Sequence, residues 1–154
     1  ILFNLILFQT LSIIMKSTIW IVLLSLAGSL ASAQTTTFTT TFKFASIEEG
    51  YDHLCKTQVW INGVLAGEST PANESEGGTI TVQVPYGEQR VLVTNYAQYE
   101  GEWEEHTIDN NYSIDCMWQG THVFDKKPSK FFLLFDIDSG TSVSWKKMPS
   151  KPKK

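Results

Sequence analysis

A tryptophan in the middle of the chain is surrounded by acidic side chains, which are the first residues that could do chemistry. The acids around Trp103 are Glu100, Glu102, Glu104 and Glu105. In a strand Glu102 and Glu104 face the same way, with Trp103 on the other side. Two carboxyl groups about 5 to 9 Å apart across a glycosidic bond can hydrolyse it. Glu102, Glu104 and the more distant Asp138 therefore define a small-hydrolase hypothesis, and the alternative is a solvated acidic edge of a sheet.

Large aromatic side chains near these acids suggest a second kind of site. A sugar ring stacks on an aromatic ring while carboxylates and amides bind its hydroxyl groups. Trp60 alternates with Val59 and Ile61, so we expect it to point away from the core. The sequence predicts a ligand-binding surface made of Trp60, Tyr96, Tyr99, Trp103, Glu102 and Glu104. The alternative is that these rings pack within the core or on a sheet surface.

The chain has two cysteines, Cys55 and Cys116. In an oxidising compartment two cysteines in one small domain usually pair, so we expect a Cys55–Cys116 disulfide, with two free thiols as the alternative. His53 and His122 lie near them in sequence, but structural zinc usually uses tighter cysteine pairs. We expect no catalytic residues, no metal site and no cofactor, with the small hydrolase kept as an alternative.

Charge is distributed unevenly along the chain. Residues 34–145 contain 16 Asp and Glu against six Lys and Arg, a balance of −10, and residues 146–154 contain five lysines and no acid. Binding of phosphate backbones needs a basic face, so the acidic body excludes nucleic acid as the main partner. The lysine- and proline-rich tail 146–154 has almost no apolar residue, and we expect it to be disordered.

The segment from Met15 to Ala33 has the order of a secretory signal peptide. A single lysine is followed by an apolar run and then by Ala31-Ser32-Ala33, whose small side chains fit the peptidase pocket. We expect cleavage after Ala33 and a secreted or periplasmic protein. Residues 1–14 are expected to be upstream sequence that is not translated, and we expect no membrane span after cleavage; the alternative is one longer membrane segment over residues 1–33.

The rest of the chain has the pattern of strands joined by turns. The expected strands are 35–44, 58–61, 64–66, 79–84, 89–94, 102–108, 112–117, 130–136 and 141–145. Asn62-Gly63 predicts a hairpin turn, because both residues accept positive φ. Asp138-Ser139-Gly140 predicts another, and Pro85 to Glu88 predicts a third between 79–84 and 89–94. Such spacing is typical of an antiparallel β-sandwich, immunoglobulin-like or PEGA-like, or of a partly open barrel. One domain over residues 34–145 follows from the length.

One stretch of the chain resembles a known family. Val59 to Gly67 reads VWINGVLAG, Thr70-Pro71 and a Pro85/Gly87 turn follow, and Val91 to Tyr96 reads VLVTNY. This order, over Val59 to Gly101, is similar to that of PEGA-type modules, small β-sandwiches of bacterial envelope proteins. The resemblance implies an envelope or surface module without catalytic activity.

These patterns lead to a main hypothesis about function and two alternatives. The main hypothesis is an exported, non-catalytic binding or structural module that acts by contact with other proteins of the envelope or extracellular space. The first alternative is a carbohydrate-binding module that uses the exposed aromatics. The second is the small hydrolase. Loops on a rigid sandwich usually carry recognition, so the loop regions 68–78 and 96–103 are the surfaces expected to function.

Overall fold

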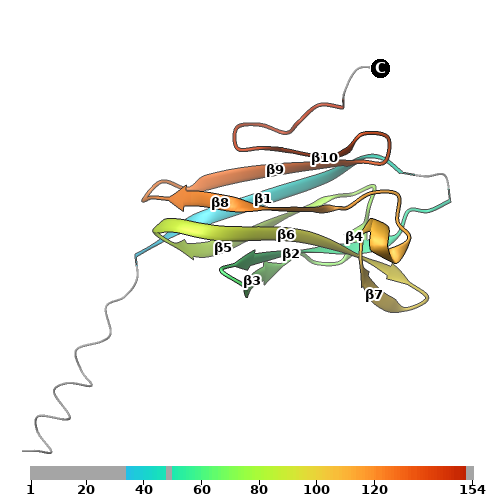
Figure 1. Ribbon diagram of the computed structural model, residues 1–154, viewed down its shortest axis with the longest axis horizontal. Helices are drawn as coiled ribbons and strands as arrows, with labels where there is room; N and C mark the ends of the chain where they lie inside the picture. Colours follow the sequence, from blue (N-terminus) through green and yellow to red (C-terminus); the bar gives the residue numbers. More distant parts are fainter. Residues whose placement is uncertain (1–33, 48–49, 152–154) are drawn as a thin grey trace, which may run out of the picture. The chain divides into compact units, whose positions relative to one another are not determined.

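The computed structural model describes residues 34–47 and 50–151, and these form a β-sandwich of two packed sheets (Figure 1). The strands are β1 (Thr35–Ser46), β2 (Leu54–Ile61), β3 (Val64–Glu68), β4 (Ala72–Asn73), β5 (Gly78–Pro85), β6 (Gly87–Tyr99), β7 (Glu102–Glu105), β8 (Met117–Phe124), β9 (Ser129–Asp136) and β10 (Gly140–Ser144). One short 3₁₀ helix spans Ile108–Asn110. The all-β sandwich predicted from the sequence is confirmed, and the barrel alternative is not.

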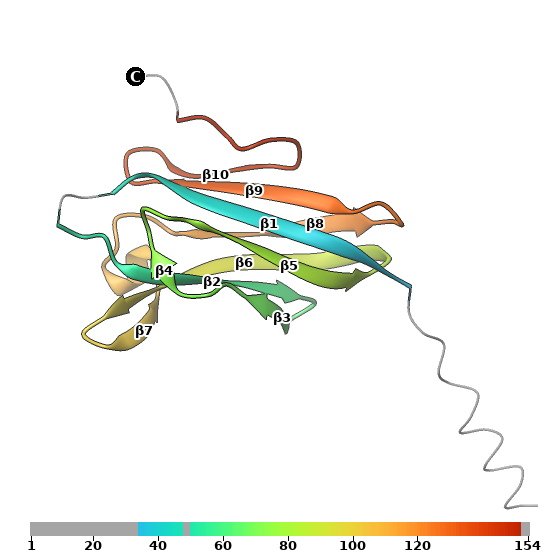
Figure 2. The same cartoon turned by 180° about the vertical axis from the view of Figure 1, so that it is seen from behind.

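The first sheet has the strand order β10-β9-β1-β5. The pairs β1–β5 and β9–β10 are antiparallel, whereas β1 and β9 run parallel, so this sheet is mixed rather than wholly antiparallel. The second sheet has the order β3-β2-β6-β7, with β4 also pairing with β2 and β8 also pairing with β6. The long strand β6 therefore pairs directly with three strands of the second sheet, β2, β7 and β8 (Figure 2).

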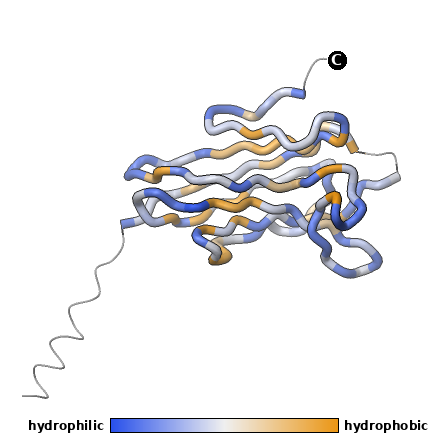
Figure 3. The backbone as a smooth tube through the Cα atoms, viewed as in Figure 1, coloured by the Kyte–Doolittle hydropathy of each residue, from blue (hydrophilic) through white to orange (hydrophobic). Residues whose placement is uncertain are grey.

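The core lies between the two sheets and follows from the alternation of side chains along the strands. On β1 every second residue faces inward, including the buried Phe38, Thr40 and Phe42. Thr39 and Thr41, which lie between them, pair on the outer face with Thr81 and Thr79 of β5. Val91 and Val93 of β6 are also fully buried. Figure 3 shows the same distribution, with hydrophobic stretches along the strands and hydrophilic residues in the β6–β7 hairpin.

The chain segment after β10 also contributes to the core. Trp145 packs on Phe38 and Phe131, with ring centroids 5.8 and 4.5 Å away, and stacks on His122 at 3.7 Å. Of the tail expected to be disordered, residues 146–151 are described. Lys151 Nζ lies 3.2 Å from Asp138 Oδ2 and 3.5 Å from Asp136 Oδ1. Residues 152–154 lie outside the described residues, as do the expected signal peptide and the upstream residues 1–14.

Two hairpins predicted from turn chemistry are confirmed, and the third is wrong. Asn62-Gly63 joins β2 to β3, and the turn at residues 137–139 joins β9 to β10. The turn at Tyr86, however, does not fold β5 and β6 into a hairpin, because β5 pairs with β1 in one sheet and β6 pairs with β2 in the other. The backbone N–H of Tyr86 instead donates to the carbonyl of Gln34, which fixes the crossing between sheets.

The structure also corrects the expected disulfide, because Cys55 and Cys116 are both buried free thiols. Cys55 lies on β2 opposite Ala97 of β6, whereas the carbonyl of Cys116 accepts a hydrogen bond from Asn95 on the other side of β6. Two positions that flank one strand are about 9 to 10 Å apart, since neighbouring strands are separated by 4.7 to 4.9 Å. A disulfide needs Cα atoms closer than about 7 Å, so the intervening strand keeps the thiols apart.

Among the described residues, no helix is long and apolar enough to cross a membrane.

Candidate functional site

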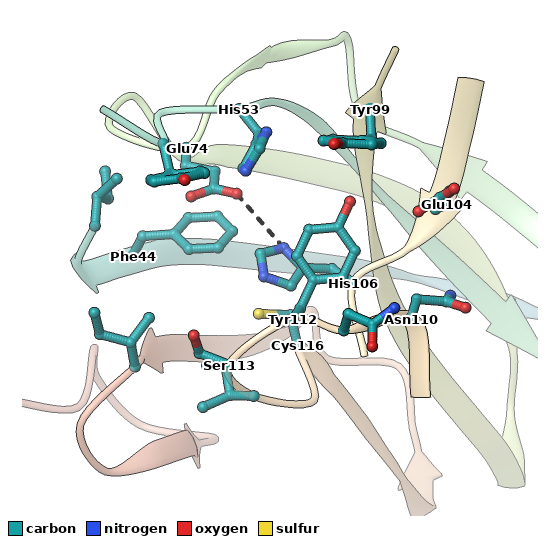
Figure 4. Close-up of a pocket in the computed structure, with 15 residues that line it drawn as sticks. Phe44, His53, Glu74, Tyr99, Glu104, His106, Asn110, Tyr112, Ser113 and Cys116 are labelled. Atoms are coloured by element: carbon teal, nitrogen blue, oxygen red, sulfur yellow. Dashed lines mark ion pairs between the residues drawn. The ribbon is translucent and has the colours of Figure 1, made fainter. Parts of the chain in front are cut away.

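A pocket of about 500 Å³ opens at one end of the sandwich (Figure 4). At this end β4, β7 and the 3₁₀ helix lie close together in both ribbon views. The lining combines aromatic rings, two glutamates and two histidines with small polar and apolar groups: Phe44, Ile47, Tyr51, His53, Glu74, Tyr99, Glu104, His106, Asn110, Asn111, Tyr112, Ser113, Ile114, Cys116 and Ile137. These residues come from distant parts of the sequence, so only the sheet topology brings them together.

Glu74 is the acid inside the pocket, and its backbone is held firmly. It directly follows β4, which pairs with the start of β2, and its N–H donates to the carbonyl of His53. Asp52 accepts hydrogen bonds from the backbone N–H and the hydroxyl of Ser75, at 3.0 and 2.7 Å, and so anchors the turn that carries Glu74. The Glu74 side chain is only 6% exposed, and burial raises its pKa to about 7, helped by the nearby negative charge of Asp52.

His106 faces Glu74 across the pocket floor. Its Nδ1 lies 3.5 Å from Glu74 Oε1, an ion pair only if the imidazole is protonated. Burial lowers the pKa of His106 to about 4, with a smaller contribution from His53, so the imidazole is neutral at neutral pH. Near that pH we therefore assign the pair a carboxyl group that loses its proton at about pH 7 and an uncharged histidine, rather than a permanent ion pair.

The orientation of His106 is set by a buried amide. Asn95 has no exposed surface, and its Oδ1 lies 3.2 Å from His106 Nδ1 while its Nδ2 donates to Thr57 Oγ1 at 2.9 Å. Because that amide nitrogen is engaged by Thr57, Asn95 Oδ1 is left as the acceptor, which assigns the proton of His106 to Nδ1. Backbone hydrogen bonds from Asn95 to Cys116 and from Cys116 to His106 fasten the same three segments together.

Tyr112 forms the wall next to His106. Their ring centroids are 4.3 Å apart, and His53 meets the edge of the Tyr112 ring at 6.0 Å. The hydroxyl of Tyr112 and Oε1 of Glu74 are both buried and form no hydrogen bond with any described residue. Burial raises the pKa of Tyr112, and Glu104 and Glu74 add to the effect, so the phenol keeps its proton. The pocket thus presents an unpartnered carboxyl oxygen and an unpartnered hydroxyl group.

Cys116 also lines the pocket but is a poor nucleophile. Burial raises the pKa of its thiol far above the ordinary value, and the residue has no exposed surface. A thiol must ionise to attack, so this cysteine is inert in the folded protein. Within residues 34–47 and 50–151, no group of three or more His, Cys, Asp or Glu side chains could hold a metal ion.

The residues singled out from the sequence are only partly brought together. Tyr99 and Glu104 line the pocket, whereas Glu102 lies exposed on β7 outside it. Trp103 is covered by Lys56, whose Nζ is 4.8 Å from the ring centroid, and Tyr96 donates its hydroxyl to Glu105 at 3.0 Å.

The other two predicted residues lie away from the pocket. Trp60 borders a separate hollow of about 200 Å³ on the outer side of the second sheet, together with Arg90 and Gln119. Asp138 belongs to the β9–β10 turn, where Lys151 contacts it.

The residues that define the pocket chemistry, Glu74, His106 and Tyr112, were missed by the sequence reasoning. Glu74 stands in a polar acidic loop, and neither His106 nor Tyr112 belongs to a motif. Their spacing of 32 and six residues matches no catalytic signature, so no local signal could have identified them.

No protein-family model matches the chain, and no curated protein matches it in sequence. The resemblance to PEGA-type modules therefore stays a prediction. Among solved structures, the chain is similar to the 5-hydroxyisourate hydrolase of Klebsiella pneumoniae, with a TM-score of 0.42 and 14% identity over 73% of this chain and 99% of that one.

Our main functional expectation, a non-catalytic protein-interaction module, is corrected against this neighbour, whose name is that of a hydrolase. We do not pursue that expectation. A similarity at this level transfers no activity, substrate or residue role to the present chain. The case for hydrolysis is therefore made below from the pocket alone.

Proposed function

We propose that the protein is a small hydrolase whose active site is the pocket around Glu74. The observation that carries the proposal is the buried Glu74 carboxyl group, which lies 3.5 Å from a neutral His106 and has a pKa of about 7. Proton transfer is most effective when the pKa of the catalytic group lies near the working pH. A strongly shifted carboxyl group inside a pocket is a typical sign of a functional site.

The roles of the side chains follow from their chemistry. The ionised Glu74 takes a proton from a water molecule, whose oxygen then forms a bond to the carbonyl carbon of an ester, amide or lactone. The hydroxyl of Tyr112 donates a hydrogen bond to the carbonyl oxygen as negative charge develops there. When the carbon–heteroatom bond breaks, protonated Glu74 returns its proton to the leaving group. His106, held by Asn95, positions Glu74 and contributes no net charge.

The proposal is tested by screening the purified protein against chromogenic esters, amides, lactones and glycosides. We expect turnover of an acyl substrate, with a pH profile that rises through about pH 7 as Glu74 loses its proton. Glu74→Gln keeps the shape of the side chain and should lower kcat by about 10²- to 10⁴-fold. The matched control Glu102→Gln removes a carboxylate outside the pocket and should leave kcat unchanged. Absence of turnover across the screen, or turnover that survives Glu74→Gln, contradicts the proposal.

Export remains part of the proposal, on the strength of the Met15–Ala33 pattern. Sequencing the N-terminus of the protein recovered from an exporting host should give Gln34 as the first residue. Recovery of an uncleaved chain from the cytoplasm would count against it.

A further inference from the structure

The charged side chains of the pocket wall are mainly acidic. Glu74 and Glu104 line it, and among the described lining residues there is no lysine or arginine. His106 is neutral, because burial lowers its pKa to about 4. The neighbouring lysine Lys56 is engaged elsewhere, since its Nζ lies 3.1 Å from Glu68 and over the ring of Trp103. Among the described lining residues, His53 is the other side chain that could carry positive charge, against the two carboxyl groups.

Two buried polar atoms of the pocket have no hydrogen-bond partner among the described residues. Oε1 of Glu74 is buried in a side chain 6% exposed and accepts no hydrogen bond, and the buried hydroxyl oxygen of Tyr112 has no partner either. The carboxylate of Glu104 makes no ion pair or hydrogen bond with another described side chain. A buried polar atom without a partner costs about 1 to 3 kcal/mol, so a ligand rich in N–H donors is favoured.

Aromatic rings complete the wall. Tyr99, Tyr112, Tyr51 and Phe44 line the same pocket. In Figure 4 the hydroxyl of Tyr112 points toward the space between His53 and Tyr99, and the carboxylate of Glu104 lies on the same side as Tyr99. The faces of such rings carry negative charge and attract a cation placed within about 6 Å. Rings and carboxylates together therefore favour the same kind of ligand.

We propose that the pocket takes a small organic cation, an amine-bearing molecule whose ammonium group lies against Glu104 and the rings of Tyr99 and Tyr112. This names the substrate class of the proposed hydrolase and rests on the pocket being its functional site. Glu104 and the tyrosines hold the charged end of the substrate, which leaves Glu74 to move the proton. The acidic body of the protein adds long-range attraction for a cation.

The test compares three ligands that share one ring and differ in charge: benzylamine, benzyl alcohol and benzoate. Each is titrated into the isotope-labelled protein at about pH 6, where Glu74 is mostly protonated, and Kd is read from amide chemical shifts. We expect benzylamine to bind about tenfold more tightly than benzyl alcohol, and benzoate to bind most weakly.

Matched variants locate the cation site. Glu104→Gln should weaken benzylamine about fivefold or more and leave benzyl alcohol unchanged, whereas Glu102→Gln, on the same strand but outside the pocket, should change neither. Benzoate binding as tightly as benzylamine, no binding by any of the three, or an unchanged Kd in Glu104→Gln overturns the inference.

The outcome is separable from that of the proposed function. Selective benzylamine binding in a protein with no hydrolytic turnover keeps the cation site and rejects the hydrolase. Turnover of neutral acyl substrates without preference for amines keeps the hydrolase and rejects the cation site.

Discussion

Oε1 of Glu74 and Nδ1 of His106 lie 3.5 Å apart with both side chains less than a tenth exposed. Burial pushes the pKa of the two groups in opposite directions, raising that of Glu74 to about 7 and lowering that of His106 to about 4. Each shift disfavours the charged form, so the folded protein resists ionising either group. Burial therefore favours a neutral carboxyl beside a neutral imidazole between about pH 4 and pH 7, with a proton available to a ligand.

This relationship predicts an opposed pH dependence of stability in two variants. Because the pKa of Glu74 is raised from its ordinary value of 4.5 to about 7, the contribution of Glu74 to stability falls as the pH rises between these two values. Lowered pKa at His106 means that its contribution rises as pH increases from about 4 to its ordinary 6.5. In the wild type these two contributions to the pH dependence of stability nearly cancel where their pH ranges overlap.

Removing one of the two groups should make the pH dependence contributed by the other measurable. Relative to the wild type, Glu74→Gln should gain stability as pH rises from about 4.5 to 7, and His106→Gln should lose it over the overlapping range. We expect changes on the order of 1 to 2 kcal/mol, since water at the pocket mouth screens part of the charge. Urea unfolding at a series of pH values measures both. Parallel pH profiles in the three proteins would contradict the assignment.

The second prediction concerns Asn95, which joins Thr57 and His106 inside the core. Replacing it by leucine keeps the approximate volume but leaves two buried polar atoms without partners. We expect Asn95→Leu to destabilise the protein by about 2 to 4 kcal/mol, measured by chemical denaturation. The control Gln98→Leu alters a half-buried amide on the same strand and should cost less than about 1 kcal/mol. Equal losses in the two variants would mean that the buried network contributes little.

How far the sequence anticipates this fold depends on whether a feature is local. The Asn62-Gly63 hairpin and the alternation of β1 follow from turn chemistry and periodicity, and both are found. The expected strand 112–117 is wrong, and β8 spans Met117–Phe124 instead. Its interior Gly120 lowers the strand propensity of this segment. In the structure the Trp118 ring lies over this glycine, where an added Cβ would come within 2.5 Å of Cζ2.

The pocket could not be predicted, because its members meet only through sheet pairing. Glu74 depends on the pairing of β4 with β2, and His106 depends on its backbone hydrogen bond to Asn95 of β6. The crossing at Tyr86 places β5 and β6 in different sheets, although its turn residues fit a hairpin equally well. Local sequence indicates most of the strands, whereas the partner of each strand is set by packing of the whole core.

The third prediction concerns the cysteines. Burial raises the pKa of Cys55 to about 11 and that of Cys116 further, so neither thiol should react with Ellman's reagent in the folded protein at mildly alkaline pH. Both should react once guanidinium chloride unfolds the chain without reductant. If the unfolded, unreduced protein shows no thiol, the Cys55–Cys116 bridge expected from the sequence is present after all and the strands around β6 are arranged differently.

The last prediction separates stability from function at Tyr112. Its hydroxyl is buried without a partner, so Tyr112→Phe removes an unsatisfied polar atom and keeps the ring 4.3 Å from His106. We expect the free energy of unfolding to stay within about 0.5 kcal/mol of the wild type or to rise. Turnover, in contrast, should fall by about 10- to 10²-fold, because the donor to the developing oxyanion is lost.

Tyr96→Phe is the matched control, since the Tyr96 hydroxyl donates to Glu105 outside the pocket. This variant should change stability slightly and turnover not at all. Two variants with the same turnover would remove Tyr112 from the proposed mechanism, and a larger loss of stability in Tyr112→Phe would show that its hydroxyl serves the fold.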